Sequence, residues 1–238
     1  MTKALTTEAE LVAAYLATQD PGNGVTLLLH EFETLAGIPD VVLLDMPSAD
    51  SDQDVIAELL VTKMATNGHA SVLSSLHRRA PRHVEHISRT TGLAPNYVRR
   101  IVAELRGMGL IEVMPSGAVK LSISYQTPRV RFTALEFKLS DWRRALAQAL
   151  RHRSFAAVTV VVMPMGREHS LQAASAVFRE YGVGSAVFDH EKMQLRYIVK
   201  PRVRTPTSAR VYLDAVGRAA ARGRHAINRS DEARPQES

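Results

Sequence analysis

The sequence predicts an α/β fold, and three patterns lead to that class. Residues 157–163 form a continuous, largely β-branched run, which is typical of a strand buried on both faces of a parallel sheet. Residues 141–150 and 170–181 place apolar side chains at helical spacing on either side of that run. Residues 54–127 have a separate helical pattern and interrupt the sheet-forming part. We therefore expect a sheet flanked by helices, with a smaller module inserted into it.

The N-terminal part is expected to supply a helix and then a strand. Thr7 and Glu10 have the spacing of a capping box, in which each side chain accepts a hydrogen bond from the other residue's backbone N–H. Farther along, Pro39 and Asp40 lead into the apolar residues 41–44. This pattern predicts a buried strand with a carboxylate at its start.

The inserted segment contains two helical patterns followed by a pair of strands. Apolar residues recur at helical spacing over residues 84–105, and Gly92 separates them into two helices. Residues 109–113 and 119–123 are strand-like and flank a Pro-Ser-Gly turn. The segment resembles the winged helix-turn-helix of bacterial regulators.

That resemblance implies binding to double-stranded DNA. The second helix is expected from Pro95 to about Gly107, since proline suits the first turn of a helix. Arginine binds phosphate bidentately and also reads guanine edges, and several arginines converge on this module. For any single arginine a solvated surface is the alternative, and some winged modules serve only dimerisation or protein docking. The expected DNA contacts are Arg78, Arg79, Arg82, Asn96, Tyr97, Arg99, Arg100 and Lys120.

A second group of chemically active side chains follows the module. In the apolar residues 133–139, Glu136 and Lys138 stand two positions apart, so in a strand both are expected to project from one face. If the strand after Asp40 lies beside this one, two carboxylates and a lysine meet in one cleft. Carboxylates bind hard cations, and a cation near the attacked phosphate offsets its charge. The pattern therefore predicts metal-assisted phosphodiester hydrolysis.

These residues resemble the signature of the PD-(D/E)xK nuclease superfamily, with Pro39 and Asp40 as its first half and Glu136 to Lys138 as its second. The halves are 96 positions apart, whereas the family usually joins them by a short hairpin or loop, and the inserted module accounts for the difference. The resemblance implies a restriction-endonuclease-like three-layer core with a mixed sheet. It also implies that Asp40 and Glu136 hold Mg²⁺ or Mn²⁺, and that Lys138 positions the attacking water.

Two helix-borne side chains complete the site that the resemblance implies. The superfamily often adds a glutamate from a helix, for which Glu10 is the expected carrier with Glu8 behind it, although capping is the simpler explanation of Glu10. Related nucleases often place a glutamine in the helix after the acidic pair, and Gln148 stands there. A surface glutamine on an amphipathic helix is the alternative.

The expected domains follow from these boundaries. A nuclease-like core would comprise residues 1–53 and 128–205, with the winged module, residues 54–127, between its two parts. Residues 206–238 would hold a basic helix, over about 207–221, followed by a polar disordered tail.

Charge and composition bear on partners and location. The 238-residue chain has a net charge of +6, but residues 1–60 contain one basic residue against eleven acidic ones, so the basic excess lies in the module and the C-terminal half. Disulfides and thiolate metal sites are excluded because the chain has no cysteine. We find no membrane-spanning run, no secretory signal and no phosphate-binding glycine loop. We therefore expect a cytoplasmic, nucleoid-associated bacterial protein.

Two functions from different classes remain. The first is a metal-dependent DNA endonuclease, which would favour a homodimer if each active site cuts one strand of a duplex. The second is a non-catalytic DNA-binding regulator or structural factor whose nuclease-like core serves dimerisation. The presence of Glu136 and Lys138 favours the first, since a docking platform has no chemical need for them.

Overall fold

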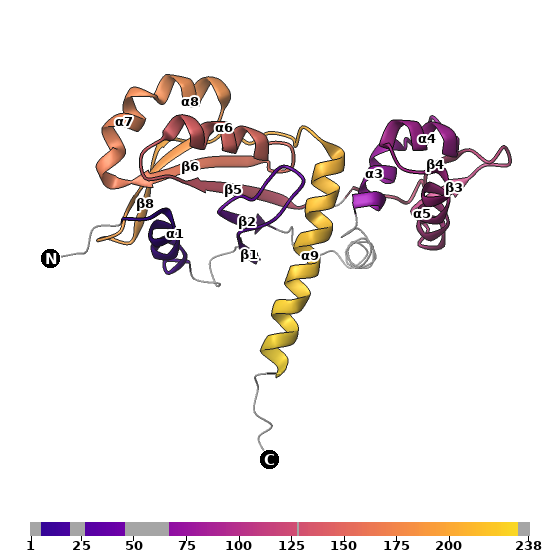
Figure 1. The fold of residues 1–238 in the computed structure, drawn as a ribbon, viewed down its shortest axis with the longest axis horizontal. Coiled ribbons are helices and arrows are strands. Elements are labelled where there is room, and N and C mark those ends of the chain that lie inside the picture. Colours follow the sequence, from indigo (N-terminus) through magenta and orange to yellow (C-terminus); the bar gives the residue numbers. More distant parts are fainter. Residues whose placement is uncertain (1–5, 20–26, 46–66, 128, 233–238) are drawn as a thin grey trace, which may run out of the picture. The chain divides into compact units, whose positions relative to one another are not determined.

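The computed structural model describes residues 6–19, 27–45, 67–127 and 129–232. The chain divides into two compact units (Figure 1). Unit 1 comprises Met1–Pro47 and Val130–Ser208, and unit 2 comprises Ser48–Arg129 and Ala209–Ser238. Each unit is therefore assembled from two stretches of chain. Unit 2 contains the segment expected as the inserted module together with the C-terminal segment, which the sequence had led us to treat separately.

Unit 1 is built on a six-stranded mixed sheet with the order β1-β2-β5-β6-β7-β8 (Figure 1). The strands are β1 Leu27–His30, β2 Val41–Asp45, β5 Arg131–Phe137, β6 Val158–Pro164, β7 Gly184–Asp189 and β8 Gln194–Val199. Pairing is antiparallel from β1 through β2 to β5, parallel from β5 through β6 to β7, and antiparallel again between β7 and β8. The α/β class predicted from the sequence is confirmed.

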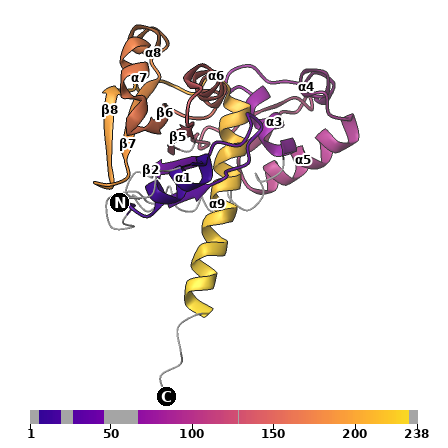
Figure 2. The ribbon, with the colours of Figure 1, turned by 60° about the vertical axis from the view of Figure 1, so that its left-hand side comes forward.

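Helices cover both faces of this sheet (Figures 1 and 2). They are α1 Glu8–Leu16, α6 Trp142–His152, α7 Glu168–Ala173 and α8 Ser175–Tyr181, with a short 3-10 turn at Met165–Arg167. Leu11 of α1 packs in one core with Val162 of β6, whereas Ala149 of α6 and Phe178 of α8 pack in another core with Val161. Because neighbouring side chains of a strand point to opposite faces, β6 contributes to both cores. The continuous apolar run of the sequence therefore forms a strand that is covered on both sides.

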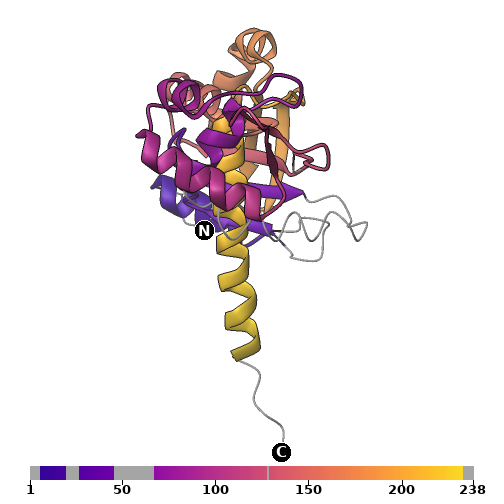
Figure 3. The same cartoon turned by 90° about the vertical axis from the view of Figure 1, so that its right-hand side faces the viewer.

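Unit 2 contains four helices and a hairpin among its described residues (Figure 3). They are α3 Asn67–Ser75, α4 Val84–Thr91, α5 Pro95–Gly107, β3 Ile111–Val113, β4 Val119–Leu121 and α9 Ala209–Glu232. The backbone of Gly92 has a φ of 72°, which ends α4 and turns the chain toward α5. Pro95 occupies the first turn of α5, where its missing N–H leaves no helical hydrogen bond unmade.

The C-terminal helix differs from its expected extent. α9 packs against α3 and continues to Glu232, so residues 222–232 are helical where the sequence suggested the start of a disordered tail. This expectation was wrong over those residues, and the rest of the tail lies outside the described residues. No helix in the described part of the chain is both long and apolar enough to cross a membrane.

Candidate functional site

Asp40 and Glu136 lie opposite each other on neighbouring strands of unit 1. The antiparallel register pairs Val41 of β2 with Leu135 of β5, so the next pair outward is Asp40 and Glu136. Opposed side chains of such a pair project from one face, with Cβ atoms about 5 Å apart. Asp40 Oδ2 also accepts a hydrogen bond of 2.7 Å from the N–H of Phe137. The fold thus brings together two carboxylates that are 96 positions apart in the sequence.

The carboxylate of Glu136 is fully buried and contacts His152, the last residue of α6. Glu136 Oε1 lies 2.5 Å from His152 Nε2. The other oxygen, Glu136 Oε2, and the other ring nitrogen, His152 Nδ1, are buried without a hydrogen-bond partner among the described residues. Gly37, in the loop that leads to Asp40, has a φ of 113°, and a Cβ built there would lie 3.7 Å from His152 Cε1.

His152 was not among the residues selected from the sequence. The available signal was its helical spacing from Ala145 and Ala149, which are both buried and belong to the inward face of α6. A polar ring at the end of an apolar stripe requires a polar partner, and the fold supplies Glu136.

Lys138 follows β5, and its ammonium group lies between two acceptors. Nζ donates to Glu8 Oε2 at 2.8 Å and to the carbonyl oxygen of Phe137 at 3.0 Å. Glu8 is in the first turn of α1, and α1 covers the face of the sheet opposite to α6. Lys138 and Glu136 therefore reach helices on different faces. Their hydrogen-bond partners thus differ, while the charges of both side chains act on Asp40.

Glu10 has a different environment from the one that the resemblance implied. Its Oε2 accepts hydrogen bonds from the backbone N–H groups of Thr6 and Thr7 at 2.8 and 3.2 Å, while Thr7 Oγ1 accepts from Glu10 N at 3.1 Å. This is the capping box predicted from the sequence. The acid from α1 that contacts Lys138 is Glu8.

Asp40, Glu136, Lys138 and Glu8 are together called the carboxylate site below, and the other three charges act on Asp40. Burial is the largest cause that raises the pKa of Asp40 from 3.8 to about 6. The hydrogen bond from Phe137 N–H and the charge of Lys138 lower this pKa, whereas the charges of Glu136 and Glu8 raise it. The net effect favours the protonated form of Asp40.

The donor atoms of this site can be compared with what a metal ion needs. Among the described residues, no three His, Asp or Glu side chains are gathered closely enough to hold a metal ion. Two opposed carboxylates remain, and Glu136 Oε2 is a buried oxygen with no partner in the described part of the chain. Mg²⁺ is commonly bound through one or two carboxylates while water and phosphate oxygens fill its other positions. Asp40 and Glu136 fit that mode of binding.

Gln148 lies one helical turn before His152, on α6. Residues four positions apart share a helix face, so Gln148 lies on the side of α6 that meets Glu136. Its Oε1 atom is buried and has no partner among the residues that the structure describes. A buried acceptor without a donor is uncommon in folded proteins, and it marks a place where a bound group could supply one.

In unit 2, three of the expected DNA contacts form an exposed polar surface on α5. Arg99 donates to Asn96 Oδ1 at 2.8 Å, and its other terminal nitrogen lies 3.3 Å from Glu85 of α4. Arg100 is exposed beside them. Ion pairs between exposed groups are weak, so Arg99 can exchange its carboxylate partner for a phosphate at little cost.

Tyr97, in contrast, packs against α3. A Cβ built on Gly68 would lie only 2.6 Å from the Tyr97 hydroxyl oxygen. The guanidinium carbon of Arg100 lies 4.8 Å from the centroid of the tyrosine ring, in a cation–π contact. Tyr97 is therefore a partly buried packing residue that supports an exposed arginine.

The remaining expected DNA contacts have different environments. Arg79 is exposed. Arg82 forms two backbone hydrogen bonds of 2.8 Å with Val119, and Lys120 Nζ lies 2.9 Å from Glu112 Oε2 across the hairpin. The backbone of Arg82 thus joins the segment before α4 to β4, and Lys120 links β4 to β3.

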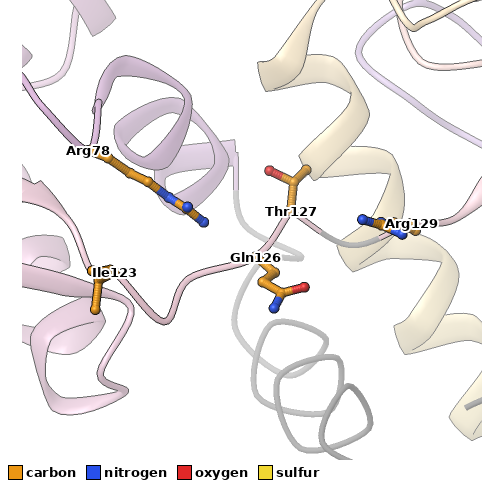
Figure 4. A pocket seen from close by; sticks show the side chains of 5 residues that line it. All are labelled: Arg78, Ile123, Gln126, Thr127 and Arg129. Atoms are coloured by element: carbon orange, nitrogen blue, oxygen red, sulfur yellow. The ribbon is translucent and has the colours of Figure 1, made fainter. Parts of the chain in front are cut away.

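Arg78 belongs to a pocket of about 480 Å³ in unit 2. The lining residues are Arg78, Ile123, Gln126, Thr127 and Arg129 (Figure 4). Arg78 also donates to the carbonyl oxygen of Tyr125, which fixes one end of its guanidinium group. Figure 4 shows the Arg78 and Arg129 side chains extending toward this space from opposite sides.

Comparisons with known proteins found no match for this chain among protein-family models, curated proteins or solved structures. The function must therefore be inferred from the geometry of the carboxylate site and from the surface of unit 2.

Proposed function

We propose that the protein is a metal-dependent DNA endonuclease. The observation that carries this proposal is the juxtaposition of Asp40 and Glu136 across the β2 and β5 pair, with Lys138 next to them. The order of elements supports a restriction-endonuclease-like core, because adjacent strands carry the two halves of the acidic signature and unit 2 contains the chain between them. On this interpretation the module is inserted into the connection between β2 and β5, and these two strands remain paired neighbours in the sheet.

Asp40 and Glu136 would hold a Mg²⁺ or Mn²⁺ ion. Such an ion would polarise the phosphate and lower the pKa of a bound water. Asp40 is ionised above pH 6, the form that binds a cation, because its pKa is about 6. Glu136 is kept in place by His152, and Asp40 by the N–H of Phe137.

Lys138 would supply a positive charge beside the reacting phosphate. Its ion pair with Glu8 keeps the ammonium group at the end of β5. Glu8 is about half exposed, so the pair can open toward an incoming phosphate. That exchange would stabilise negative charge that develops on the phosphate oxygens.

Unit 2 would supply the affinity for duplex DNA. Helices α4 and α5 with the β3 and β4 hairpin follow the order of a winged helix-turn-helix, and α5 carries exposed Asn96, Arg99 and Arg100. The Arg78 and Arg129 pocket offers a second place for a backbone phosphate. Cutting both strands of a duplex with one site per chain would favour a homodimer.

A non-catalytic DNA-binding regulator is the second candidate, and one observation favours it. Glu136 is completely buried and bonded to an equally buried histidine. A buried pair of this kind can also serve only to fix the packing of α6 on the sheet.

A plasmid-nicking assay separates the two candidates. We expect the full chain to nick supercoiled DNA with Mg²⁺, and expect EDTA or Glu136→Ala to abolish nicking. Asp45→Ala is the matched control, because Asp45 lies at the far end of β2 and is paired with Arg131 at the surface. DNA binding without nicking by a folded wild-type protein would support the regulator instead.

A further inference from the structure

The contact between His152 and Glu136 joins two side chains that are both enclosed by the fold. Their exposed fractions are 2% and 0%, and the joining distance is 2.5 Å. An ionised carboxylate can only accept hydrogen bonds, so His152 Nε2 must be the donor to an ionised Glu136.

The histidine ring is itself fixed by its surroundings. It lies at the end of α6 and meets the ring of Phe155 edge-on, with the centroids 6.0 Å apart. A Cβ at Gly37 would lie 3.7 Å from His152 Cε1, and the positive φ of Gly37 disfavours most other residues at this position. A ring held in this way is a rigid support for a flexible side chain.

Glu136 needs such a support because a glutamate has several rotatable bonds. The contact with His152 leaves Glu136 Oε2 as the oxygen without a partner in the described part of the chain. Asp40, on the next strand, is likewise held through Oδ2 by Phe137 N–H. Each carboxylate is therefore anchored by one oxygen, which fixes the orientation of the other.

We propose that His152 is a positioning residue that orients Glu136 for a divalent cation. This inference rests on the proposed function, because it assigns His152 to the metal site of the endonuclease. His152 does not contact the ion, and it acts through its hydrogen bond to Glu136. Partners of this kind typically contribute 10–100-fold to metal affinity.

The test is a pair of substitutions that differ by one methylene group. The amide nitrogen of glutamine can take the place of His152 Nε2, whereas that of asparagine is too short to reach Glu136. Mn²⁺ binding to the full chain is measured by isothermal titration calorimetry without DNA, so that affinity is observed separately from cleavage. We expect His152→Gln to bind Mn²⁺ within about 3-fold of wild type and His152→Asn to bind it about 10–100-fold more weakly.

Two controls make the outcomes distinct. Glu136→Ala should lose the site, and His169→Asn, which alters an exposed histidine of α7, should bind Mn²⁺ like wild type. Wild-type affinity in His152→Asn, or equal weakening in the Gln and Asn variants, would overturn the positioning role while leaving the metal site in place. Absence of Mn²⁺ binding by wild type would overturn both the metal-dependent function and this inference. Circular dichroism melts establish that each variant is folded.

Discussion

The two acidic side chains of the carboxylate site differ in how they are buried. Glu136 is completely enclosed and bonded to His152, whereas Asp40 is only partly buried and accepts the N–H of Phe137. Burial is the largest effect that disfavours the ionised form of Asp40, and the charges of Glu136 and Glu8 add to it, whereas the hydrogen bond from Phe137 N–H and the charge of Lys138 only partly offset these effects. Folding therefore disfavours the ionised form of Asp40, and perturbed pKa values of this kind are common among functional carboxylates.

That cost predicts a pH-dependent gain in stability for Asp40→Asn. The folded-state pKa of about 6 lies above the unfolded value near 3.8, so the folded state binds the proton more tightly. The free energy of unfolding of the wild type therefore falls as the pH rises from about 4 to about 6. Asparagine has no charge to bury and can still accept from Phe137. We expect the variant to gain about 1–2 kcal/mol at pH 8, after allowance for solvent screening, and nothing below pH 4.

Urea unfolding with EDTA at pH 4 and pH 8 measures this difference. Asp45→Asn removes an exposed charge from β2, the strand that follows Asp40, and serves as the control. A gain that is equal at the two pH values would contradict the account of Asp40.

Lys138 should be needed for cleavage and dispensable for DNA affinity. Lys138→Ala removes one cation beside the reacting phosphate, and loss of a group that stabilises a transition state typically lowers the rate by about 100-fold or more. Unit 2, which would bind the duplex, is unchanged. Nicking rates and gel-shift affinities are compared with those of Lys192→Ala, which removes an exposed lysine of unit 1. If affinity falls as far as the rate does, Lys138 is a general DNA contact.

At the scale of elements, α3 leaves little room beside α5 at Gly68. A Cβ on Gly68 would lie 2.6 Å from the Tyr97 hydroxyl and 2.9 Å from Ile101 Cδ1. Since Ile101 is buried in the core of unit 2, neither helix can move away without loss of packing. We expect Gly68→Ala to lower the free energy of unfolding by about 1–3 kcal/mol, as overpacking typically does.

Gly107→Ala is the matched control for that prediction. It makes the same change at the end of α5, where no atom lies within 4 Å of the added Cβ, so helix propensity should leave stability equal or slightly higher. Thermal unfolding of both variants provides the comparison. Equal melting temperatures would mean that α3 and α5 tolerate a wider separation.

The exposed face of α5 should determine DNA affinity and its salt dependence. Arg99→Ala with Arg100→Ala should weaken duplex binding and reduce the slope of log K against log salt by about 0.9 for each phosphate that is no longer bound. A change in base preference would identify a guanine-reading arginine, whereas uniform weakening would identify arginines that bind phosphate. Arg179→Ala with Arg202→Ala removes the same charge from the surface of unit 1. If the two double variants give superimposable gel-shift curves at every salt concentration, α5 does not read DNA.

At the scale of the whole molecule, local patterns predicted the central strands better than the edges. β6 is buried on both faces, and its continuous apolar run marked it in the sequence. β8 was not predicted, because this edge strand has mostly exposed side chains and no clear alternation. An edge strand is defined by its partner, β7, and the sequence of the strand alone does not reveal that pairing.

The sequence allowed the prediction of those site residues that lie beside apolar strands, but not of a residue whose contact depends on helix packing. Asp40 and Glu136 were selected because each stands at an apolar stretch, and the register of β2 on β5 brings them together. His152 was missed because its contact with Glu136 depends on how α6 crosses the sheet. The capping role of Glu10 was predicted by spacing within one helical turn, whereas the contact of Glu8 with Lys138 spans 130 positions.

The division into two units predicts separate responses to the two proposed ligands. A ligand that binds only the folded state stabilises the unit that holds it, by about 2.7 kcal/mol at a concentration of 100 times Kd. Mn²⁺ should therefore raise the unfolding transition of unit 1 by roughly 10 °C, whereas a short duplex should raise that of unit 2. Differential scanning calorimetry of the full chain measures both transitions, and Gly68→Ala identifies the transition of unit 2 because it lowers that one alone. Glu136→Ala should remove the Mn²⁺ shift and keep the shift caused by DNA. If Mn²⁺ moves both transitions equally in wild type and in Glu136→Ala, the ion binds elsewhere and the carboxylate site is not its site.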